Sequence, residues 1–380
     1  MHGPAHHSRK IMIVFGTRPE AIKMFPVIHA LRRQARLDVR VCLTGQHRAM
    51  LDQVLEIAGL TPDIDLNIMQ PDQTLDQLLA RLVTELGRVF DRDRPDRILV
   101  HGDTLTTLAA TLAAYFRRIP VGHVEAGLRS GNIYQPWPEE VNRRVAGTVA
   151  DMHFAPTPVA AEALRREQVP PDSIWVTGNS GIDALLYTRA AIRAQPQRAA
   201  HLDQILAPFA RHRILAMTTH RRENLGAGLG RITAAIASLA AQRPDIAFIC
   251  PVHPNPQVRQ PLQAALSGRE NVVLTDPLDY PNFVRLLDRA SLVLTDSGGV
   301  QEEAPALGKP VLVMRDATER PEGVAAGNAC LVGTDTARII GAVVRLLDDD
   351  AAYAAMARAH NPYGDGKAAA RIADVIANAD

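Results

Sequence analysis

Short apolar runs alternate with longer stretches of helical periodicity along most of the chain. The runs are rich in Val, Ile and Leu and are continuous, which is typical of strands buried on both faces of a parallel sheet. Amphipathic stretches between such runs predict the helices that cover the two faces. The sequence therefore predicts an α/β protein of the doubly wound type. The predicted strands are residues 11–15, 39–43, 98–100, 121–124 and 152–155, and then 214–217, 247–250, 272–274, 292–294 and 311–314.

The alternation predicts two domains. A chain of 380 residues is too long for one ordinary hydrophobic core. The strand and helix pattern restarts after residues 178–186 and a polar helical stretch around 189–211. We expect Rossmann-like domains at 1–177 and 178–365, with a C-terminal helix at 366–380 that completes the first domain.

Composition excludes several classes of partner. The 42 basic and 41 acidic residues nearly cancel, and no basic stripe is interleaved with aromatics, so nucleic acid is not an expected partner. No apolar run approaches the roughly 20 residues that cross a bilayer, so no membrane partner is expected. The first ten residues lack the apolar core of a signal peptide, which indicates a cytoplasmic protein.

Cofactor and metal signals are also missing from the sequence. Cys42, Cys250 and Cys330 fall in apolar, strand-like runs and are expected to be core thiols in a reducing compartment. No Cys/His cluster has metal-ligand spacing, so no metal is expected. No Gly-x-Gly-x-x-Gly segment follows a predicted strand, which argues against a nicotinamide enzyme. We therefore expect no cofactor.

A Ser-Gly-Gly turn follows the strand at 292–294 and is the strongest local signal. Ligands of doubly wound sheets bind at the carboxyl ends of the strands. The turn formed by Ser297, Gly298 and Gly299 enters a helix and would expose free backbone N–H groups to a phosphate. Glu303 follows about one and a half turns later, and its carboxylate could accept hydrogen bonds from ribose hydroxyls. The pattern indicates a nucleoside diphosphate site; the alternative is a capped turn without a ligand.

Cations follow the first predicted strand. Arg18 and Lys23 would lie near the start of the next helix and suit an anionic ligand. The alternative is that Arg18 pairs with Glu20.

Three carboxylates follow strands or begin a helix in the first half. Asp103, Glu125 and Glu139 could converge, and acids that share a partly dry site repel each other's charge and separate into an acid and a base. The alternative is that Glu125 pairs with Arg129 and that Glu139 is a solvated helix-start residue.

Polar groups in the second half complete the pattern. His220 lies between a strand and an arginine pair, where it could hydrogen-bond or protonate a phosphate. His253 begins a rigid turn and is expected to be structural or peripheral. Arg320 could bind ligand or lock its loop through Glu319 or Glu322.

Together these segments resemble the non-hydrolysing UDP-N-acetylglucosamine 2-epimerases, over about residues 10 to 372. The resemblance implies two Rossmann-like domains facing across a cleft in a glycosyltransferase-B-like arrangement, with the active site between them, and a homodimer. The matching segments are Phe15-Gly-Thr-Arg-Pro-Glu-Ala-Ile-Lys23, Thr44-Gly-Gln-His-Arg48, His101-Gly-Asp-Thr104, Gly122-His-Val-Glu-Ala-Gly-Leu-Arg129, Pro136-Trp-Pro-Glu-Glu140, His220-Arg-Arg-Glu-Asn224, Thr295-Asp-Ser-Gly-Gly-Val-Gln-Glu-Glu-Ala-Pro305, Arg320-Pro-Glu322 and His360-Asn-Pro-Tyr-Gly-Asp-Gly366.

The resemblance also implies an activity: reversible interconversion of UDP-GlcNAc and UDP-ManNAc by elimination of UDP to 2-acetamidoglucal and re-addition, without a cofactor. It implies acid–base roles for Asp103, Glu125 and Glu139, and assistance to the leaving diphosphate by His220. UDP would be bound by Arg18, Lys23, Phe283, Ser297, Gly298, Gly299, Glu303 and Arg320. Gln46 and His253 fall in segments like those that bind a second UDP-GlcNAc as activator in some members.

Three other functions stay open at this point. They are a relative that hydrolyses UDP-GlcNAc to ManNAc and UDP, a glycosyltransferase of the same architecture, and a non-catalytic sugar-nucleotide sensor. One departure from the family pattern is Gly181, where members commonly have valine near the predicted crossing between domains.

Overall fold

The computed structural model describes residues 8–45, 48–70 and 72–379. The chain divides into two compact units, which are described separately. Unit 1 comprises Met1–Ala184 and Gly364–Asp380, and unit 2 comprises Leu185–Tyr363. The boundary falls within the helix α7 (Ser180–Ala194). The division into folding domains at 1–177 and 178–365 stays a prediction.

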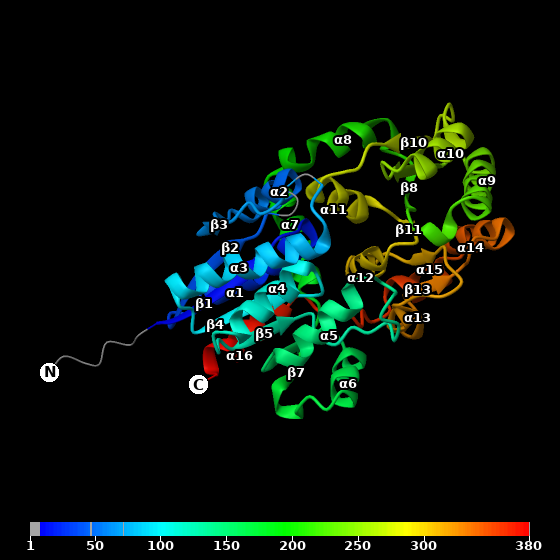
Figure 1. Ribbon diagram of the computed structural model, residues 1–380. Helices are drawn as coiled ribbons and strands as arrows, with labels where there is room; N and C mark the ends of the chain where they lie inside the picture. Colours follow the sequence, from blue (N-terminus) through cyan, green and yellow to red (C-terminus); the bar gives the residue numbers. More distant parts are fainter. Residues whose placement is uncertain (1–7, 46–47, 71, 380) are drawn as a thin grey trace. The chain divides into compact units, whose positions relative to one another are not determined.

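Unit 1 contains a parallel sheet with helices on its faces (Figure 1). Every strand pair in it is parallel, as expected for continuous apolar strands joined by helices. The strands in sheet order are β3 (Ile64–Asp65), β2 (Leu37–Leu43), β1 (Arg9–Phe15), β4 (Arg97–His101), β5 (Val121–Val124), β6 (Met152–Ala155) and β7 (Ile174–Val176). The helices are α1 (Arg18–Arg32), α2 (Arg48–Ala58), α3 (Leu75–Asp93), α4 (Leu105–Tyr115), α5 (Glu139–Val149), α6 (Pro158–Arg166) and α16 (Ala368–Asn378), with a short 3-10 turn at Pro171–Ser173.

The C-terminal helix α16 packs on α1 in unit 1. The Arg9 guanidinium donates to the carbonyl oxygens of Ile376 and Ala377, at 2.7 and 2.9 Å, and also to that of Ala379. A cation at the helix C-terminus satisfies carbonyls that have no partner within the helix. At the N-terminus of α16, the backbone N–H groups of Ala368 and Ala369 donate hydrogen bonds to the Asp183 carboxylate.

Unit 2 contains a second parallel sheet, covered on one face by α9, α10 and α14 (Figure 1). Its strands in sheet order are β10 (Val272–Thr275), β9 (Ile246–Pro251), β8 (Arg213–Thr218), β11 (Leu292–Thr295), β12 (Val311–Val313) and β13 (Ala329–Leu331). Its helices are α8 (Ala200–Leu206), α9 (Ala227–Gln242), α10 (Pro256–Leu266), α11 (Tyr280–Arg289), α12 (Gly298–Ala306), α13 (Pro321–Ala326), α14 (Thr336–Asp348) and α15 (Asp350–Ala357), with 3-10 turns at Pro196–Ala199, Ala207–Phe209 and Arg222–Asn224.

The predicted fold class, two Rossmann-like doubly wound α/β units, is confirmed. Each predicted strand is present, but β3, β7 and β13 were missed. All three are sheet edges of two or three residues with partly exposed side chains, so their apolar runs, where they have one, are too short to stand out as buried strands. The prediction that Cys330 is a core thiol is wrong, because Cys330 lies exposed on the edge strand β13, whereas Cys42 and Cys250 are buried.

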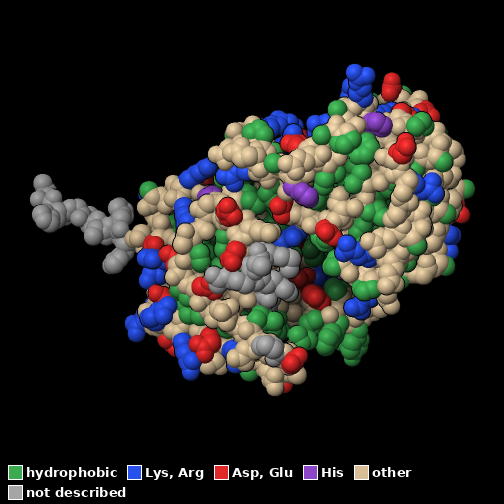
Figure 2. Space-filling view, turned by 90° about the horizontal axis from the view of Figure 1, so that it is seen from above, with side chains coloured by type: hydrophobic (Ala, Val, Ile, Leu, Met, Phe, Trp, Pro, Cys, Tyr) green, Lys and Arg blue, Asp and Glu red, His purple; other side chains and the backbone are tan. Residues whose placement is uncertain are grey.

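No helix among the described residues combines the length and the apolar character needed to cross a membrane. On the face shown in Figure 2, Lys and Arg side chains are interspersed with Asp and Glu.

Candidate active site

The carboxyl ends of β1, β4 and β5, which are adjacent in the sheet, gather polar side chains around Glu125 in unit 1. Lys23, on α1 after β1, forms an ion pair with Glu125 Oε1. His101, the last residue of β4, places its Nε2 atom 3.3 Å from Glu125 Oε2, outside hydrogen-bond geometry. The Glu125 side chain is 11% exposed. The structure thus brings Lys23 and Glu125 together, and adds His101.

Glu125 has an unusual backbone conformation. Its φ angle is +61°, in the left-handed region, which costs a non-glycine residue about 1–3 kcal/mol. The turn around it is closely fitted: a Cβ atom added at Gly127 would lie 2.2 Å from the carbonyl oxygen of Ala160. A Cβ at Gly102, at the end of β4, would lie 3.4 Å from Glu125 Oε2. Close packing therefore holds a strained residue in one position.

Two buried histidines flank this turn in neutral form. Burial lowers the pKa of His101 to about 4 and that of His123 to about 3. His123 Nε2 lies 2.7 Å from the carbonyl oxygen of Gly102 and ties β5 to the turn after β4. Glu125 therefore has an uncharged ring on one side and the Lys23 ammonium on the other.

Asp103 lies one residue beyond the Gly102 turn and forms an ion pair with Arg143 on α5. Asn142, also on α5, donates to the carbonyl oxygen of Asp103 at 2.9 Å. Burial raises the pKa of the Asp103 carboxyl, against the influence of Arg143, and the charges of Glu125 and Glu139 raise it further. Burial and the two neighbouring carboxylates therefore favour the protonated form of Asp103, and Arg143 opposes it.

Glu139 is the first residue of α5 and approaches the same group. Its Oε2 atom is buried and has no hydrogen-bond partner among the described residues. The neighbouring Glu140 is fully buried and accepts from the Ser130 backbone N–H at 3.0 Å and from Arg144 Nε at 3.2 Å, which anchors the start of the helix. The three predicted carboxylates thus share one neighbourhood at the strand ends.

Two alternative pairings from the sequence are wrong. Arg129 pairs with Glu167 at 2.7 Å, whereas Glu125 pairs with Lys23. Glu20 is buried and accepts from the Thr17 backbone N–H at 2.8 Å and from the Thr104 hydroxyl at 2.7 Å, so it caps α1. Arg18 begins α1 and is partly buried.

Asp296 organises the corresponding cluster in unit 2. It follows β11, has no exposed surface, and accepts from the Thr219 hydroxyl, the Asn224 amide and the backbone N–H groups of His220 and Arg221. Its Oδ1 lies 3.3 Å from His220 Nδ1. Burial opposes ionisation, but hydrogen bonds from His220 and its neighbours hold the pKa of Asp296 below its ordinary value. Asp296 therefore orients His220 after β8.

The predicted Ser-Gly-Gly turn begins α12, with Ser297 as N-cap residue. Two arginines and a carboxylate approach Gly298: a Cβ added there would lie 3.1 Å from Glu319 Oε1, 3.7 Å from Arg221 Nη2 and 3.8 Å from Arg320 Cζ. A Cβ added at Gly299 would meet no atom within 4 Å. Backbone N–H groups and two guanidinium groups at one helix N-terminus suit a phosphate.

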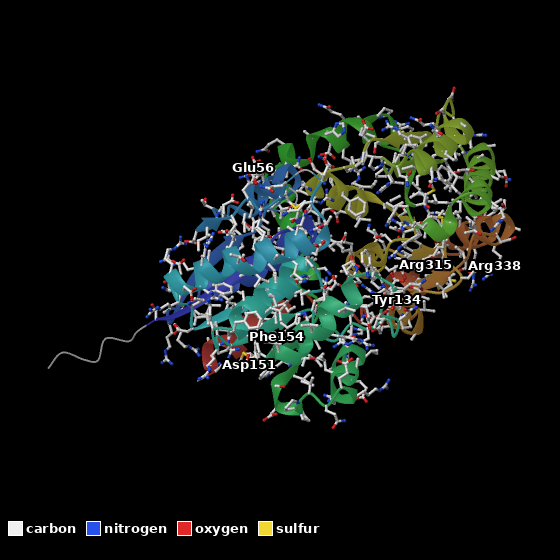
Figure 3. All side chains as sticks on the ribbon, in the orientation of Figure 1. Glu56, Tyr134, Asp151, Phe154, Arg315 and Arg338 are labelled. Carbon is white, nitrogen blue, oxygen red and sulfur yellow. The ribbon has the colours of Figure 1, made fainter. Side chains whose placement is uncertain are left out.

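Acidic partners hold these arginines. Arg221 pairs with Glu319 at 2.7 Å. Arg315, which is labelled in Figure 3, pairs with both Glu319 and Glu223. Arg320 pairs with Glu302 on α12, a partner that the sequence analysis missed.

The remaining predicted residues lie in several places. His253 is exposed, and its ring stacks on that of His220, with 5.9 Å between centroids and 20° between planes. Phe283 on α11 and Glu303 on α12 are partly buried, and their contacts with uracil and ribose stay predictions. Gln46 lies outside the described residues.

Sequence reasoning missed His101, Arg143, Asp296 and Glu302 as members of these clusters. His101 and Asp296 had a usable signal, since each is a polar residue at the carboxyl end of a predicted strand. Arg143 lies four residues after Glu139, at helical spacing on the same face. Glu302 had no comparable signal, because its partner Arg320 is on another element.

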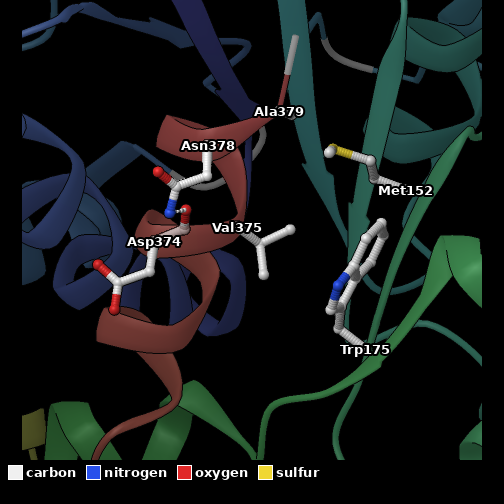
Figure 4. Close-up of a pocket in the computed structure, with 6 residues that line it drawn as sticks. All are labelled: Met152, Trp175, Asp374, Val375, Asn378 and Ala379. Atoms are coloured by element: carbon white, nitrogen blue, oxygen red, sulfur yellow. Dashed lines mark hydrogen bonds between the residues drawn. The ribbon is translucent and has the colours of Figure 1, made fainter.

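A separate pocket of about 340 Å³ lies elsewhere in unit 1 (Figure 4). It is lined by Met152 and Trp175 from the sheet, by Asp374, Val375 and Asn378 from α16, and by Ala379 just after that helix. Met152 begins β6, so the pocket lies toward the amino ends of the strands, away from Glu125. No three His, Cys, Asp or Glu side chains in the described ranges are grouped as a metal site would require.

The doubly wound sheets and the polar clusters at their strand ends define a Rossmann-like α/β protein. A family model described as UDP-N-acetylglucosamine 2-epimerase matches residues 29–377. The chain belongs to the UDP-N-acetylglucosamine 2-epimerase family.

Individual proteins agree with this assignment. A probable UDP-N-acetylglucosamine 2-epimerase of Ralstonia nicotianae is 52% identical over 370 residues, covering 97% of this chain and 98% of the relative. A UDP-N-acetylglucosamine 2-epimerase of Yersinia pestis is also 52% identical over 370 residues, with the same coverage. The crystal structure of UDP-GlcNAc 2-epimerase from Neisseria meningitidis bound to UDP-GlcNAc has a TM-score of 0.88 and 46% identity, covering 97% of this chain and 99% of that chain.

Proposed function

We propose that this protein interconverts UDP-GlcNAc and UDP-ManNAc by reversible epimerisation at C2, without releasing free sugar. The observation that carries the proposal is the group of carboxylates at the strand ends of unit 1, in which the pKa of Asp103 is raised although Arg143 pairs with it. A carboxyl group with a raised pKa can both give and take a proton, as removal and return of a carbon-bound proton require. Membership of the family supports the choice of substrate.

The proposed route is elimination and re-addition. A carboxylate of unit 1 removes the C2 proton, the electrons of the C2–H bond form a C1=C2 double bond, and the C1–O bond breaks with its electrons on the phosphate of UDP. The intermediate is 2-acetamidoglucal. A proton then returns to C2 from the other face, and the phosphate oxygen of UDP adds back to C1. Asp103, Glu125 and Glu139 share the acid–base work.

Most of the groups that are proposed to hold UDP belong to unit 2. Ser297, Gly298 and Gly299 at the start of α12, with Arg320, would bind the diphosphate, and His220 would hydrogen-bond or protonate the departing phosphate. Glu303 would accept from the ribose, Phe283 would lie beside the uracil, and Arg18 and Lys23 would add positive charge. These roles place most positive charge on the leaving group, where negative charge develops.

Regulation and assembly are further parts of the proposal. The ring of His253 stacks on that of His220, which is proposed to assist the leaving diphosphate. A ligand that touches His253 could therefore affect His220, which supports a role for His253 in binding a second UDP-GlcNAc as activator. A sigmoidal dependence of rate on UDP-GlcNAc that becomes hyperbolic in His253→Ala would support this role. We also propose a cytoplasmic homodimer, which light scattering on the purified protein would test for assembly.

The test of the reaction is incubation with UDP-GlcNAc in D₂O, followed by proton NMR. The expected result is a mixture of UDP-GlcNAc and UDP-ManNAc with deuterium at C2 in both. Free ManNAc and UDP would instead identify a hydrolysing enzyme. An unchanged spectrum despite UDP binding would contradict the proposal and favour a transferase or a sensor.

A further inference from the structure

The side chain of Tyr363 ends between two backbone groups at the start of α13. Tyr363 is the last residue of unit 2 and is 2% exposed. Its hydroxyl accepts from the Gly323 N–H at 2.9 Å and donates to the carbonyl oxygen of Arg320 at 3.1 Å. One hydroxyl group therefore closes the first turn of α13, at the residue from which the Arg320 side chain extends.

The segment before Tyr363 also bonds to Glu302, the ion-pair partner of Arg320. Asn361 donates to the carbonyl oxygen of Glu302 at 3.4 Å and accepts from the Tyr363 N–H at 3.2 Å. The Glu302 carboxylate pairs with the Arg320 guanidinium. The backbone and the side chain of Arg320 are thus both held by groups that bond to residues 361–363.

The fit around the Tyr363 hydroxyl leaves little freedom. A Cβ atom added at Gly323 would lie 3.0 Å from the hydroxyl oxygen and 3.1 Å from Asn328 Oδ1. Asn328 in turn donates to the carbonyl oxygen of His360 at 3.0 Å. The start of α13 therefore has one well-packed position relative to residues 360–363.

We propose that Tyr363 is a positioning residue that fixes the backbone of Arg320, so that the guanidinium is held at the N-terminus of α12 before the diphosphate binds. This inference rests on the proposed role of Arg320 in binding UDP. A guanidinium that is already oriented loses less side-chain freedom on binding, so the affinity for the diphosphate is higher. A tyrosine that only stabilised the fold would leave that affinity unchanged.

The test compares Tyr363→Phe with Tyr353→Phe. Tyr353 on α15 is a matched control, because its hydroxyl donates to the carbonyl oxygen of Ser291 at 2.9 Å, just before the amino end of β11. UDP binding would be measured by calorimetry and stability by thermal unfolding. We expect Tyr363→Phe to weaken UDP binding about 5- to 10-fold, as loss of an ordinary hydrogen bond predicts, and Tyr353→Phe to change it less than about twofold. Equal losses of stability with unchanged UDP affinity in both variants would overturn the inference.

A double-mutant cycle with Arg320→Ala adds a second readout. If Tyr363 acts through Arg320, Tyr363→Phe weakens UDP binding in the native background but not in Arg320→Ala. The same loss in both backgrounds would overturn the inference. Because the readout is UDP binding, a protein that binds UDP but does not epimerise would overturn the proposed function and leave this comparison intact. A native protein that does not bind UDP would overturn both.

Discussion

The polar clusters of the two units are built in different ways. In unit 1, Glu125 is 11% exposed, has a strained backbone and lies beside the neutral ring of His101. In unit 2, the His220 and Arg221 side chains are 39% and 36% exposed, and fixed partners orient them. Burial and nearby charge shift carboxyl pKa values, which suits proton transfer, whereas more accessible polar side chains held by fixed partners suit an anion that must arrive and leave. The difference supports a division of work between chemistry and binding.

The largest expected effect is a loss of turnover without a loss of UDP binding. Glu125→Gln or Asp103→Asn should lower the turnover of UDP-GlcNAc by about 10³-fold, because each would remove a proposed proton-transfer group while keeping its size. UDP affinity measured by calorimetry should stay within about twofold. Glu167→Gln is the control, since Glu167 pairs with Arg129 at the surface and should turn over normally. Near-native turnover in both Glu125→Gln and Asp103→Asn would contradict the inference that unit 1 carries out the proton transfer and unit 2 binds UDP.

The second prediction concerns the buried carboxylate of unit 2. Asp296→Asn should destabilise the protein by about 2–3 kcal/mol, because an amide cannot replace an ionised group that accepts several hydrogen bonds. Asp183→Asn is the matched control: Asp183 also accepts two backbone N–H groups, but burial raises its pKa, so loss of its charge should cost less. Calorimetric unfolding of both variants measures the difference. An equal or larger loss in Asp183→Asn would contradict this account of Asp296.

The third prediction uses pH to test the desolvation of unit 1. His123 has a folded-state pKa of about 3 against 6.5 for an ordinary histidine, so its contribution to stability is present above 6.5 and is lost as the pH falls toward the folded value. Between pH 7 and pH 5 the loss is about 2 kcal/mol for one such group. Both tryptophans of the chain, Trp137 and Trp175, belong to unit 1, so tryptophan fluorescence during urea unfolding follows this unit.

The control for the pH experiment is a pair of substitutions. His123→Gln should flatten the pH dependence of the unfolding free energy by about that 2 kcal/mol, because glutamine does not bind a proton in this range. His253→Gln, at an exposed histidine of unit 2, should leave it unchanged. If His123→Gln keeps the native slope, the histidine is not buried in neutral form and the contrast between the two clusters weakens.

Sequence alone predicted the strand-end positions of both clusters, because apolar runs locate buried strands and the residues that follow them must lie at one edge of each sheet. It could not predict which charges pair. Lys23 and Glu125 are 102 positions apart, and Arg320 and Glu302 lie on different elements, so only the folded chain shows these partners. The edge strands β3, β7 and β13 were missed for a related reason, since a half-exposed strand of two or three residues leaves too little pattern.

The smallest expected effect concerns Gly181, the second residue of α7. A Cβ atom at Gly181 would lie 3.0 Å from Asn179 Oδ1 and 3.6 Å from Lys23 Cε, so even alanine must push the Asn179 side chain. Gly228 is the matched control, since it is also the second residue of its helix and its added Cβ would make an ordinary contact of 3.6 Å with Thr334. Gly228→Ala should stabilise the protein by up to about 1 kcal/mol through helix propensity, and Gly181→Ala should gain less or lose stability. If both variants gain the same stability in thermal unfolding, the Asn179 side chain moves aside without cost and the packing at Gly181 does not constrain Lys23. If Gly181→Ala gains less stability and also has reduced turnover, the start of α7 belongs to the tightly packed cluster of unit 1.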